Sequence, residues 1–355
     1  MKIVLQNVLK ASVEIDGKTF NEIDKGYLLL VSFTNGDNFE KCSRLARKIS
    51  KLRVFMDENF IYIFPESIRN TISGYTMDKS LEEIRIGIKR PLILILHNKE
   101  ILTSHIISSD DLNYILQRIS NFSLYAYEEE IKQGFITIKG GHRVGIAGEC
   151  VMENNKIKTI RNISSLNIRI SREIIGASKN IMKFIFENNR VNNTLIISPP
   201  KCGKTTLLRD IARSLSSKGK RITIIDERSE IAGCYMGVPQ MNIGIRSDVL
   251  DNCLKSQGMI MAIRSLAPEV IICDEIGSKE DIESLVMAFN SGVSVISTLH
   301  GFDIEDLFFR SVFKDILDNK ILDYVIVLSN KDKVGEIKSI YKMEKEGERK
   351  FLKLL

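Results

Sequence analysis

The amino-acid sequence predicts an α/β fold whose main domain is a parallel sheet with helices on both faces. Between residues 191 and 330, short apolar runs alternate with amphipathic helical patterns, as expected of consecutive parallel β–α–β units. A Gly-Lys-Thr segment at 203–205 separates one apolar run from a helical pattern, and Asp-Glu pairs follow two other runs. These features predict a phosphate site at the carboxyl ends of the strands.

Length and composition are those of a globular protein. The 355 residues suffice for two or three domains, with 44% hydrophobic and 27% charged residues. The longest apolar runs, such as Pro91–Leu96, are far shorter than the roughly 18–20 residues that span a bilayer, and the first residues do not resemble a signal peptide. The six cysteines include no Cys-x-x-Cys pair, which argues against a zinc ribbon or a disulfide framework. We therefore expect a cytoplasmic protein.

The charge pattern favours no particular macromolecular partner. A net charge of +6 is mild for this length, and lysines scattered for solubility explain it more simply than attraction to anionic lipid or nucleic acid. Tryptophan is absent, and the aromatic residues are not interleaved with a basic stripe. Surfaces that bind single-stranded nucleic acid combine a positively charged groove with aromatic side chains on which bases stack. Because this sequence shows no such combination, nucleic-acid binding is not expected.

Four segments are expected along the chain. Residues 1–60 contain a hairpin, Ala11–Ile15 and Thr19–Ile23 around Asp-Gly, then a strand at Gly26–Phe33 and a helix at Phe39–Leu52. Residues 61–190 form a mixed α/β domain, in which Ser109-Asp110 caps a helix. Residues 191–330 form the parallel-sheet domain, and the charged tail 331–355 is expected to be peripheral.

The parallel-sheet domain is expected to contain five strands and four helices. The predicted strands are Thr194–Ser198, Arg221–Asp226, Glu269–Asp274, Val293–Thr298 and Tyr324–Ser329. The predicted helices are Thr205–Leu215, Asp248–Leu266, Ser278–Asn290 and Asp303–Asp318.

The phosphate-binding segment follows the first of these strands and opens the first helix. It runs Ser198, Pro199, Pro200, Lys201, Cys202, Gly203, Lys204, Thr205 and Thr206. In this context, backbone N–H groups and the positive helix end surround a phosphate, and Gly203 allows close approach. Lys204 would contact the β- and γ-phosphates of ATP, and the Thr205 hydroxyl would bind Mg²⁺. The pattern normally begins with glycine, and Ser198 stands there instead.

Acidic residues and a histidine follow the neighbouring strands. Asp274 would hold Mg²⁺, and Glu275 would orient or activate the attacking water. Glu227, in a second Asp-Glu pair, is an equal candidate for that base, and the residues alone do not decide between the two. His300 follows another strand and is a candidate sensor of the γ-phosphate, with a structural role as the alternative.

Residues 61–330 closely resemble the stage III sporulation protein AA family. The matching segments are Leu81–Arg85, Lys89–Pro91, Gly140–Gly145, Ile160–Arg169, Asp248–Leu250, Ile263–Ser265 and Asp274–Gly277. The resemblance implies a RecA-like P-loop NTPase core, similar to the ATPases of type II and type IV secretion systems. It also implies a homo-oligomeric ring, often a hexamer, in the mother cell of an endospore-forming bacterium. The implied partners are membrane proteins of the sporulation channel.

The same resemblance assigns roles to several residues. The pair that includes Glu227 corresponds to the Asp box, which favours Glu227 as base, and His300 corresponds to the His box. Arg143, Arg161 and Arg169 are candidates for reaching a γ-phosphate, where positive charge would stabilise the transition state. Ordinary salt bridges are the alternative for these arginines.

Residues 1–60 instead resemble the beginning of D-aminoacyl-tRNA deacylase. The resemblance rests on Met1–Val8, Ala11–Val13, Gly26–Val31 and Lys51–Phe55. The later motifs of that family, Ser-Gln-x-x-Thr and a Gly-Pro dipeptide, do not occur. The segment is therefore interpreted as a truncated, β-rich fragment without deacylase activity.

Three functions fit these observations: an ATP-hydrolysing motor coupled to a membrane partner, a nucleotide-gated assembly protein with little turnover, and a nucleic-acid-dependent ATPase. The residues favour the hypothesis of an ATP-hydrolysing motor. The nucleotide-gated assembly protein stays an alternative because serine replaces the usual glycine at position 198. ATP turnover that depended on nucleic acid and weakened steeply with salt would favour the nucleic-acid-dependent ATPase.

Overall fold

The computed structural model describes residues 2–8, 11–15, 18–23, 26–32, 58–76, 80–97, 99–121, 127–200, 202–329, 335–344 and 351–355. The chain divides into two compact units, residues 1–62 with 72–79 and residues 63–71 with 80–355. Each unit is considered separately below.

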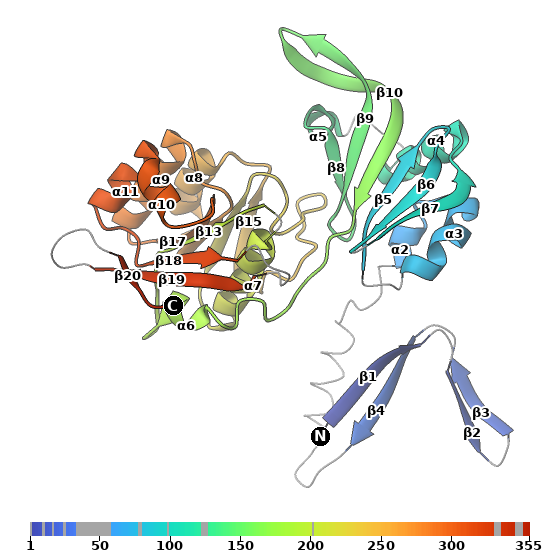
Figure 1. The fold of residues 1–355 in the computed structure, drawn as a ribbon, viewed down its shortest axis with the longest axis horizontal. Coiled ribbons are helices and arrows are strands. Elements are labelled where there is room, and N and C mark those ends of the chain that lie inside the picture. The colour runs from blue at the N-terminus through green and yellow to red at the C-terminus, as the bar shows by residue number, and fades with distance from the viewer. Residues whose placement is uncertain are drawn as a thin grey trace. The chain divides into compact units, whose positions relative to one another are not determined.

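The first unit contains two antiparallel strand pairs (Figure 1). Strand β2 (Ala11–Ile15) pairs with β3 (Lys18–Ile23), which confirms the expected hairpin strands. Strand β1 (Lys2–Val8) pairs with β4 (Gly26–Ser32). The predicted helix at Phe39–Leu52 lies outside the described residues. The short helix α2 (Glu58–Ile61) also belongs to this unit, whereas α3 (Glu66–Thr76) is divided between the units, with residues 66–71 in the second.

The second unit begins with an antiparallel sheet whose strand order is β7-β6-β5-β10-β9-β8. The strands are β5 (Leu81–Gly87), β6 (Pro91–Leu96), β7 (Lys99–Ile106), β8 (Phe135–Ile138), β9 (His142–Glu153) and β10 (Lys156–Arg169). Helix α4 (Ser109–Ile119) buries Leu112, Ile115, Leu116 and Ile119. The N-cap is Ser108, in a capping box with Asp111, so the predicted cap was one residue too late. Helix α5 (Glu128–Lys132) contacts β8 and β10.

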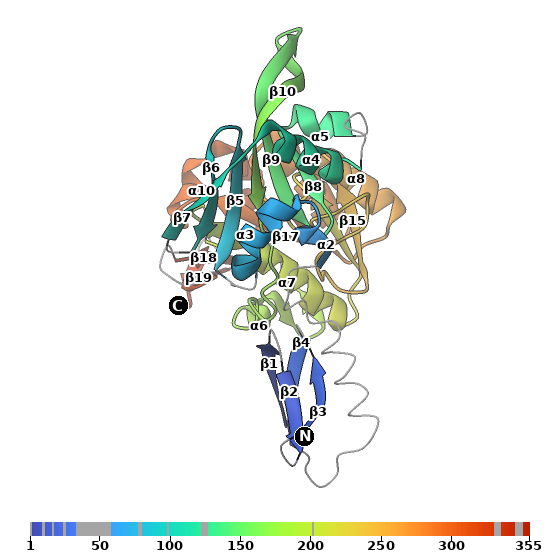
Figure 2. The same ribbon diagram turned by 90° about the vertical axis from the view of Figure 1, so that its right-hand side faces the viewer.

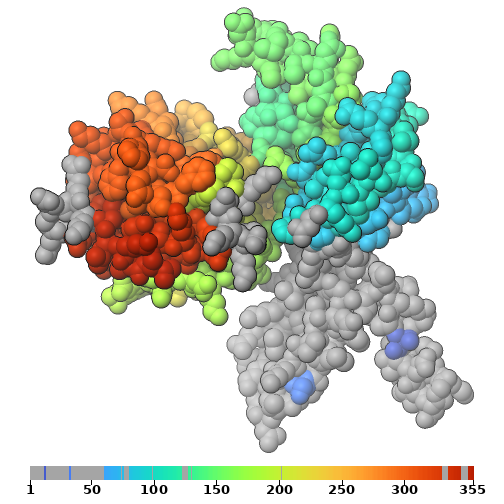
Figure 3. Space-filling view, in the orientation of Figure 1, coloured from blue at the N-terminus to red at the C-terminus, as the bar shows by residue number. Residues whose placement is uncertain are grey.

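Strands β9 and β10 extend beyond their neighbours as a two-stranded hairpin, which stands out from the domain in Figure 2 and as the green projection in Figure 3. Strand β8 pairs with β9 only as far as Gly145, and β5 pairs with β10 only from Ser165 onward. The register of the hairpin shifts between Arg161 and Ser165, opposite Gly148. A Cβ atom on Gly148 would lie 2.7 Å from the Arg161 carbonyl oxygen and 2.8 Å from the Ile163 Cα.

Replacing Gly148 with alanine should therefore destabilise the protein. Both clashing atoms belong to backbone, so the strands must separate locally, and a cost of about 1–3 kcal/mol is expected. Urea unfolding measures the loss. Gly74→Ala is the matched control, because it adds a methyl group in open space on helix α3, where alanine is the better helix former. Equal midpoints for the two variants would contradict the prediction.

The rest of the second unit is built on a sheet of order β15-β14-β16-β17-β13-β18-β19-β20. Its parallel strands are β13 (Thr194–Ser198), β14 (Ile222–Asp226), β15 (Ser247–Asp251), β16 (Val270–Cys273), β17 (Ser294–His300) and β18 (Tyr324–Leu328). Two antiparallel strands, β19 (Ile337–Met343) and β20 (Phe351–Lys353), follow β18. Short elements lead into the sheet: α6 (Met182–Ile185), β11 (Phe186–Glu187) and β12 (Arg190–Val191).

Helices cover both faces of this sheet, as predicted. Helix α7 (Lys204–Ser217) packs with one apolar cluster, which includes Leu207, Ile211 and Leu215. Helices α8 (Lys255–Ser265) and α9 (Lys279–Asn290) contribute to the cluster on the opposite face, as do the shorter α10 (Glu305–Phe309) and α11 (Lys314–Asp318). Figure 1 shows α7 separated from α8 to α11 by the sheet.

Three predictions about this domain were wrong. The segment Asp248–Leu266 is not one helix, because it begins as strand β15 before α8. Val249 packs with the α7 cluster and Leu250 with the opposite cluster. Although β15 is an edge strand, apolar residues therefore cover both of its faces. The segment Asp303–Asp318 is interrupted at Arg310, where the backbone is extended before a 3₁₀ turn at Ser311–Phe313.

The third wrong prediction concerns the tail, which is not peripheral throughout. Strand β19 pairs with β18 over Ile337–Lys342, and Ser339, Ile340 and Met343 are buried. The burial of β19 does not alternate strictly: Ile340 packs in the α7 cluster and Met343 in the cluster on the opposite face, whereas Lys338 and Lys342 are exposed. The high charge of the tail obscured these buried positions.

Candidate nucleotide site

The phosphate-binding loop has the predicted strand–loop–helix setting. All of β13 is buried, and α7 begins at Lys204. Gly203 precedes it with φ +84°, a left-handed conformation that glycine adopts without strain. The backbone N–H of Gly335, before β19, donates to the Cys202 carbonyl at 3.0 Å, so the β18–β19 connection contacts the loop. Lys201 lies outside the described residues.

Ser198 fits the position where this type of loop usually has glycine. Its side chain is completely buried, and its hydroxyl donates to the Pro199 carbonyl at 2.8 Å. The Ser198 carbonyl accepts a hydrogen bond from the Lys204 ammonium at 3.3 Å. The serine therefore turns into the loop's own backbone, and its carbonyl helps to fix the lysine.

Oxygen ligands suited to Mg²⁺ lie directly beside this loop. The Thr205 hydroxyl donates to Asp274 Oδ2 at 2.8 Å, and the Thr298 hydroxyl donates to Asp274 Oδ1. The Thr298 oxygen also accepts the Glu275 backbone N–H at 2.8 Å, so it connects β17 to the end of β16. In the described residues, no group of three or more His, Cys, Asp or Glu side chains could hold a metal. Magnesium nevertheless fits, because it commonly binds one or two protein oxygens together with phosphate and water.

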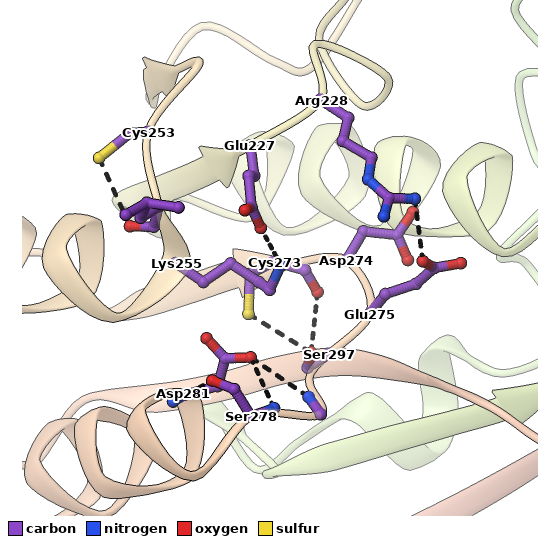
Figure 4. A network of polar contacts seen from close by, with 12 residues as sticks. Glu227, Arg228, Cys253, Lys255, Cys273, Asp274, Glu275, Ser278, Asp281 and Ser297 are labelled. Atoms are coloured by element: carbon purple, nitrogen blue, oxygen red, sulfur yellow. Dashed lines mark hydrogen bonds and ion pairs between the residues drawn. The ribbon is translucent and has the colours of Figure 1, made fainter. Parts of the chain in front are cut away.

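The two candidate bases lie at the ends of adjacent strands and have different partners (Figure 4). Glu275 has φ +48°, and its carboxylate lies 3.5 Å from the Lys204 ammonium and 3.3 Å from Arg228 Nη1. Glu227 instead forms an ion pair with Lys255, the first residue of α8. Both candidates are therefore paired with cations in this structure.

Asp226, the buried residue before Glu227, organises the loop after β14. Its carboxylate accepts backbone N–H groups from Glu230 and Ala232, each at 2.8 Å. Burial raises the pKa of Asp226, although these hydrogen bonds oppose the rise. Arg209 of α7 donates to the Glu230 and Ile231 carbonyls of the same loop. The phosphate-loop helix and the loop bearing Glu227 are thus held together through buried polar groups.

Asp251 stands opposite Asp226 in the register of β14 and β15. Burial raises the pKa of Asp251 to about 6, and the Asp226 carboxylate adds to the effect. Between the ordinary aspartate pKa of about 4 and this value, the folded protein binds a proton that the unfolded chain has released. Stability should therefore fall as pH rises through this window.

Replacing Asp251 with asparagine should remove this dependence. The melting temperature of Asp251→Asn minus that of the unmodified protein should be larger at pH 7 than at pH 4.5. The reason is that burial penalises only the charged carboxylate of the unmodified protein. Thermal unfolding at the two pH values checks the sign. The same difference at both pH values would be inconsistent with a raised pKa.

Two of the three candidate arginines lie together, and the third does not. Arg143 and Arg169 are directly opposite one another on β9 and β10. Burial lowers the pKa of Arg143, Arg169 and Arg228 lower it further, and the ion pair with Glu230 opposes this shift. The Arg143 guanidinium also lies over the Phe135 ring, 3.5 Å from its centroid. Arg161 is instead on the exposed part of the hairpin, where it pairs with Glu149 at 2.6 Å.

His300 ends strand β17 and faces Ser198 in the register of the sheet. Its side chain is exposed and meets the Phe302 ring edge-on, with centroids 6.5 Å apart. Its carbonyl accepts a hydrogen bond from Arg310 at 2.7 Å. The position beside the phosphate loop agrees with the predicted location, whereas a contact with phosphate stays a prediction.

Sequence reasoning missed four residues that contribute to this arrangement: Thr298, Arg228, Glu230 and Lys255. Thr298 is the last residue of a predicted strand and Arg228 follows another, so both positions were usable signals. Lys255 was hidden because Asp248–Leu266 was read as one helix, which left no helix start at that residue.

The strand order, the loop–helix junction and the adjacent Thr205–Asp274 pair define a P-loop NTPase fold of the RecA-like type. The chain belongs to the sporulation stage III, protein AA family, whose sequence model matches residues 56–349. Stage III sporulation protein AA of Bacillus subtilis is 45% identical over 293 residues, covering 80% of this chain and 94% of that protein. Uncharacterized protein ycf45 of Porphyra purpurea is 30% identical over 268 residues, 73% of this chain and 43% of that protein.

Solved structures share the fold at low sequence identity. The ATPase DotB of Legionella pneumophila is 16% identical with a TM-score of 0.52, covering 74% of this chain and 76% of that one. The pilus retraction motor PilT with bound ADP is 13% identical with a TM-score of 0.52, covering 79% and 80%. Within the described part of the chain, no helix has the length and apolar character needed to cross a membrane.

The N-terminal segment matches a different family. The model of D-Tyr-tRNA(Tyr) deacylase matches residues 4–73, overlapping the sporulation family match at 56–73. D-aminoacyl-tRNA deacylase of Lactobacillus acidophilus is 50% identical over 58 residues, which are 16% of this chain and 40% of that protein. The chain therefore spans less than half of the length of this relative, and the family match extends beyond residue 60, where the resemblance was predicted to end.

Proposed function

We propose that the protein binds and hydrolyses Mg-ATP and transmits the resulting conformational change to membrane partner proteins of the sporulation channel. The observation that carries this proposal is the convergence of Lys204, Thr205, Asp274 and Glu275 at one edge of the sheet. A cation for phosphate, oxygen ligands for magnesium and a carboxylate for water are the groups that phosphoryl transfer requires.

The chain's own residues would divide the work as follows. Lys204 and the first N–H groups of α7 would hold the phosphates, and Thr205 and Asp274 would hold Mg²⁺. The metal would neutralise charge on the phosphate oxygens. Glu275 or Glu227 would accept the proton of the attacking water. His300, Arg161 and Arg169 remain proposed contacts to the γ-phosphate, and Arg161 could serve only a site that its exposed hairpin can reach.

We also propose a homo-oligomer, a hexameric ring by analogy with the family, working in the mother cell at the membrane face. No nucleic-acid substrate is proposed, and no deacylase activity is proposed for the N-terminal segment. The relative with which that segment aligns extends well beyond the matched residues, and its later motifs are absent from this chain.

A nucleotide-gated assembly protein with little turnover is the second candidate. It is favoured by one observation, that Glu227 and Glu275 are both held by cations in the structure. Such a protein would change its oligomeric state with ATP without consuming it.

The deciding experiment measures phosphate release from ATP against protein concentration, with and without Mg²⁺. Oligomeric state is followed in parallel by light scattering. Magnesium-dependent turnover that rises with oligomer formation is expected. ATP-dependent assembly without phosphate release at any concentration, with or without membranes, would refute the motor and select the second candidate. Stimulation by DNA or RNA that weakens steeply with salt would select a nucleic-acid-dependent ATPase.

A further inference from the structure

A pocket of about 530 Å³ adjoins the phosphate loop on the side of strand β18. Its size lies within the range of roughly 300–1,000 Å³ that is usual for small-molecule sites. The described residues that line it are Pro199 after β13, Phe302 after β17, Leu328 and Ser329 around the end of β18, and Glu336, Ile337 and Lys338 around the start of β19. Because Pro199 belongs to the phosphate loop, the pocket and the phosphate site share a wall.

The order of the strands determines in which direction a bound nucleotide extends. Strand β13, which leads into the phosphate loop, lies between β17 and β18. The groups suited to Mg²⁺ and to the attacking water, Thr298, Asp274 and Glu275, belong to β17 or directly follow β16, on one side of the loop. The γ-phosphate must face these groups, because the metal and the water act on it. The rest of an extended nucleotide therefore points toward β18 and the pocket.

The lining of the pocket suits a nucleobase with its ribose. Pro199, Leu328 and Ile337 provide apolar surface, and 62% of the Phe302 surface is exposed. An exposed aromatic ring offers a face on which a base can stack, and such stacking accepts any base because every base has a π-face. The three polar residues of the lining add groups of the kind that fix the orientation of a ligand.

Phe302 is held in place through its backbone, although its side chain is exposed. The Gly301 N–H donates to the Ser198 carbonyl at 3.2 Å, so the chain after β17 contacts the end of β13. The Phe302 N–H donates to Asp306 Oδ2 at 2.6 Å, and the Phe302 carbonyl accepts a hydrogen bond from the Lys338 ammonium at 3.3 Å. The backbone that bears the ring is thus ordered before a ligand arrives, which lowers the entropy cost of binding.

We propose that this pocket is the subsite for the nucleoside, in which the base stacks on the Phe302 ring. This inference rests on the proposed nucleotide binding but does not depend on hydrolysis. Pyrophosphate carries the two phosphates of ADP without its nucleoside, so it would bind at the phosphate loop alone. Comparison of ADP with pyrophosphate therefore separates the pocket from the phosphate site.

Isothermal titration of ADP and of pyrophosphate into the full chain tests the proposal. Phe302→Ala should weaken ADP binding at least about fivefold and leave pyrophosphate binding unchanged, whereas Phe302→Tyr, which keeps a ring, should bind ADP within about twofold of the unmodified protein. Phe309→Ala is the matched control, because Phe309 is 84% exposed and lies outside the described lining. Equal weakening of both ligands in Phe302→Ala, or an unchanged ADP affinity, would overturn the proposal.

Stacking can also be observed directly, because the sequence contains no tryptophan. Phe302→Trp introduces a single fluorophore at the proposed stacking position, and Phe309→Trp introduces one outside the pocket lining. ADP should quench the fluorescence of Phe302→Trp, whereas pyrophosphate should not, and Phe309→Trp should respond to neither ligand. Equal quenching of Phe302→Trp by pyrophosphate, or no quenching while ADP binds, would contradict stacking at this position.

Lys204→Ala distinguishes failure of the pocket from failure of the proposed function. This variant should weaken the binding of both ADP and pyrophosphate. If it does so while Phe302→Ala affects neither ligand, the phosphate site stands and the base lies elsewhere. If Lys204→Ala leaves both affinities unchanged, the proposed function fails, and the Phe302→Ala titration still decides whether the pocket holds the base.

Discussion

Replacing Lys204 with alanine is expected to abolish ATP turnover and to weaken ATP binding at least about a hundredfold. The lysine is nearly buried at the first residue of α7 and is aligned by the Ser198 carbonyl. Its ammonium is therefore already in place, and binding a phosphate requires little reorganisation. Alanine removes this charge from a site where the surrounding protein weakens competition from water. Isothermal titration with ATP and a phosphate-release assay measure the two effects.

The fold should survive this substitution. The carboxylate left behind, Glu275, is partly exposed and keeps Arg228 as a partner. Unfolding by urea should therefore shift little compared with the loss of function. Lys218→Ala, at the exposed residue that caps the C-terminal end of the same helix, is the matched control for removal of a lysine. Unchanged ATP affinity in a folded Lys204→Ala variant would place the phosphate site elsewhere.

The sequence was most informative where local chemistry and burial agree. The residues before Ser198, Leu195–Ile197, are apolar, and α7 begins at Lys204, one residue before its predicted start. Strand ends in a parallel sheet meet at one edge, so the proximity of Asp274 to Thr205 could also be expected. These features follow from residue type and spacing alone.

The remainder depended on tertiary contacts that local patterns do not encode. Val249 and Leu250 face opposite apolar clusters, and only the sheet context distinguishes that strand from a helix start. The partners of Glu227 and Glu275 come from α8 and from the loop after β14, so their pairing with Lys255 and Arg228 required the fold. The motif that contains Arg161 likewise did not predict that this residue lies on the exposed part of the hairpin.

Replacing Arg209 with methionine is expected to lower the free energy of unfolding by about 3–5 kcal/mol. This arginine lies on α7, and only 8% of its surface is exposed. Its guanidinium donates to the Ile231 carbonyl at 2.6 Å, the Glu230 carbonyl at 2.8 Å and the Arg172 carbonyl at 2.9 Å. Burial lowers the pKa of Arg209, and the charges of Glu173 and Asp226 oppose that shift.

The size of the effect follows from what the methionine leaves behind. A side chain of similar length fills the space, but three carbonyls lose their donor, and the buried Asp226 carboxylate loses a nearby positive charge. Urea unfolding of Arg209→Met should show this loss. Arg264→Met, exposed in the last turn of α8, should change stability by less than about 0.5 kcal/mol. Because Arg209 ties the phosphate-loop helix to the loop that bears Glu227, a folded variant should also bind ATP more weakly. Equal unfolding midpoints for the two variants would mean that these carbonyls find water instead, and that α7 and the loop are held by apolar packing alone.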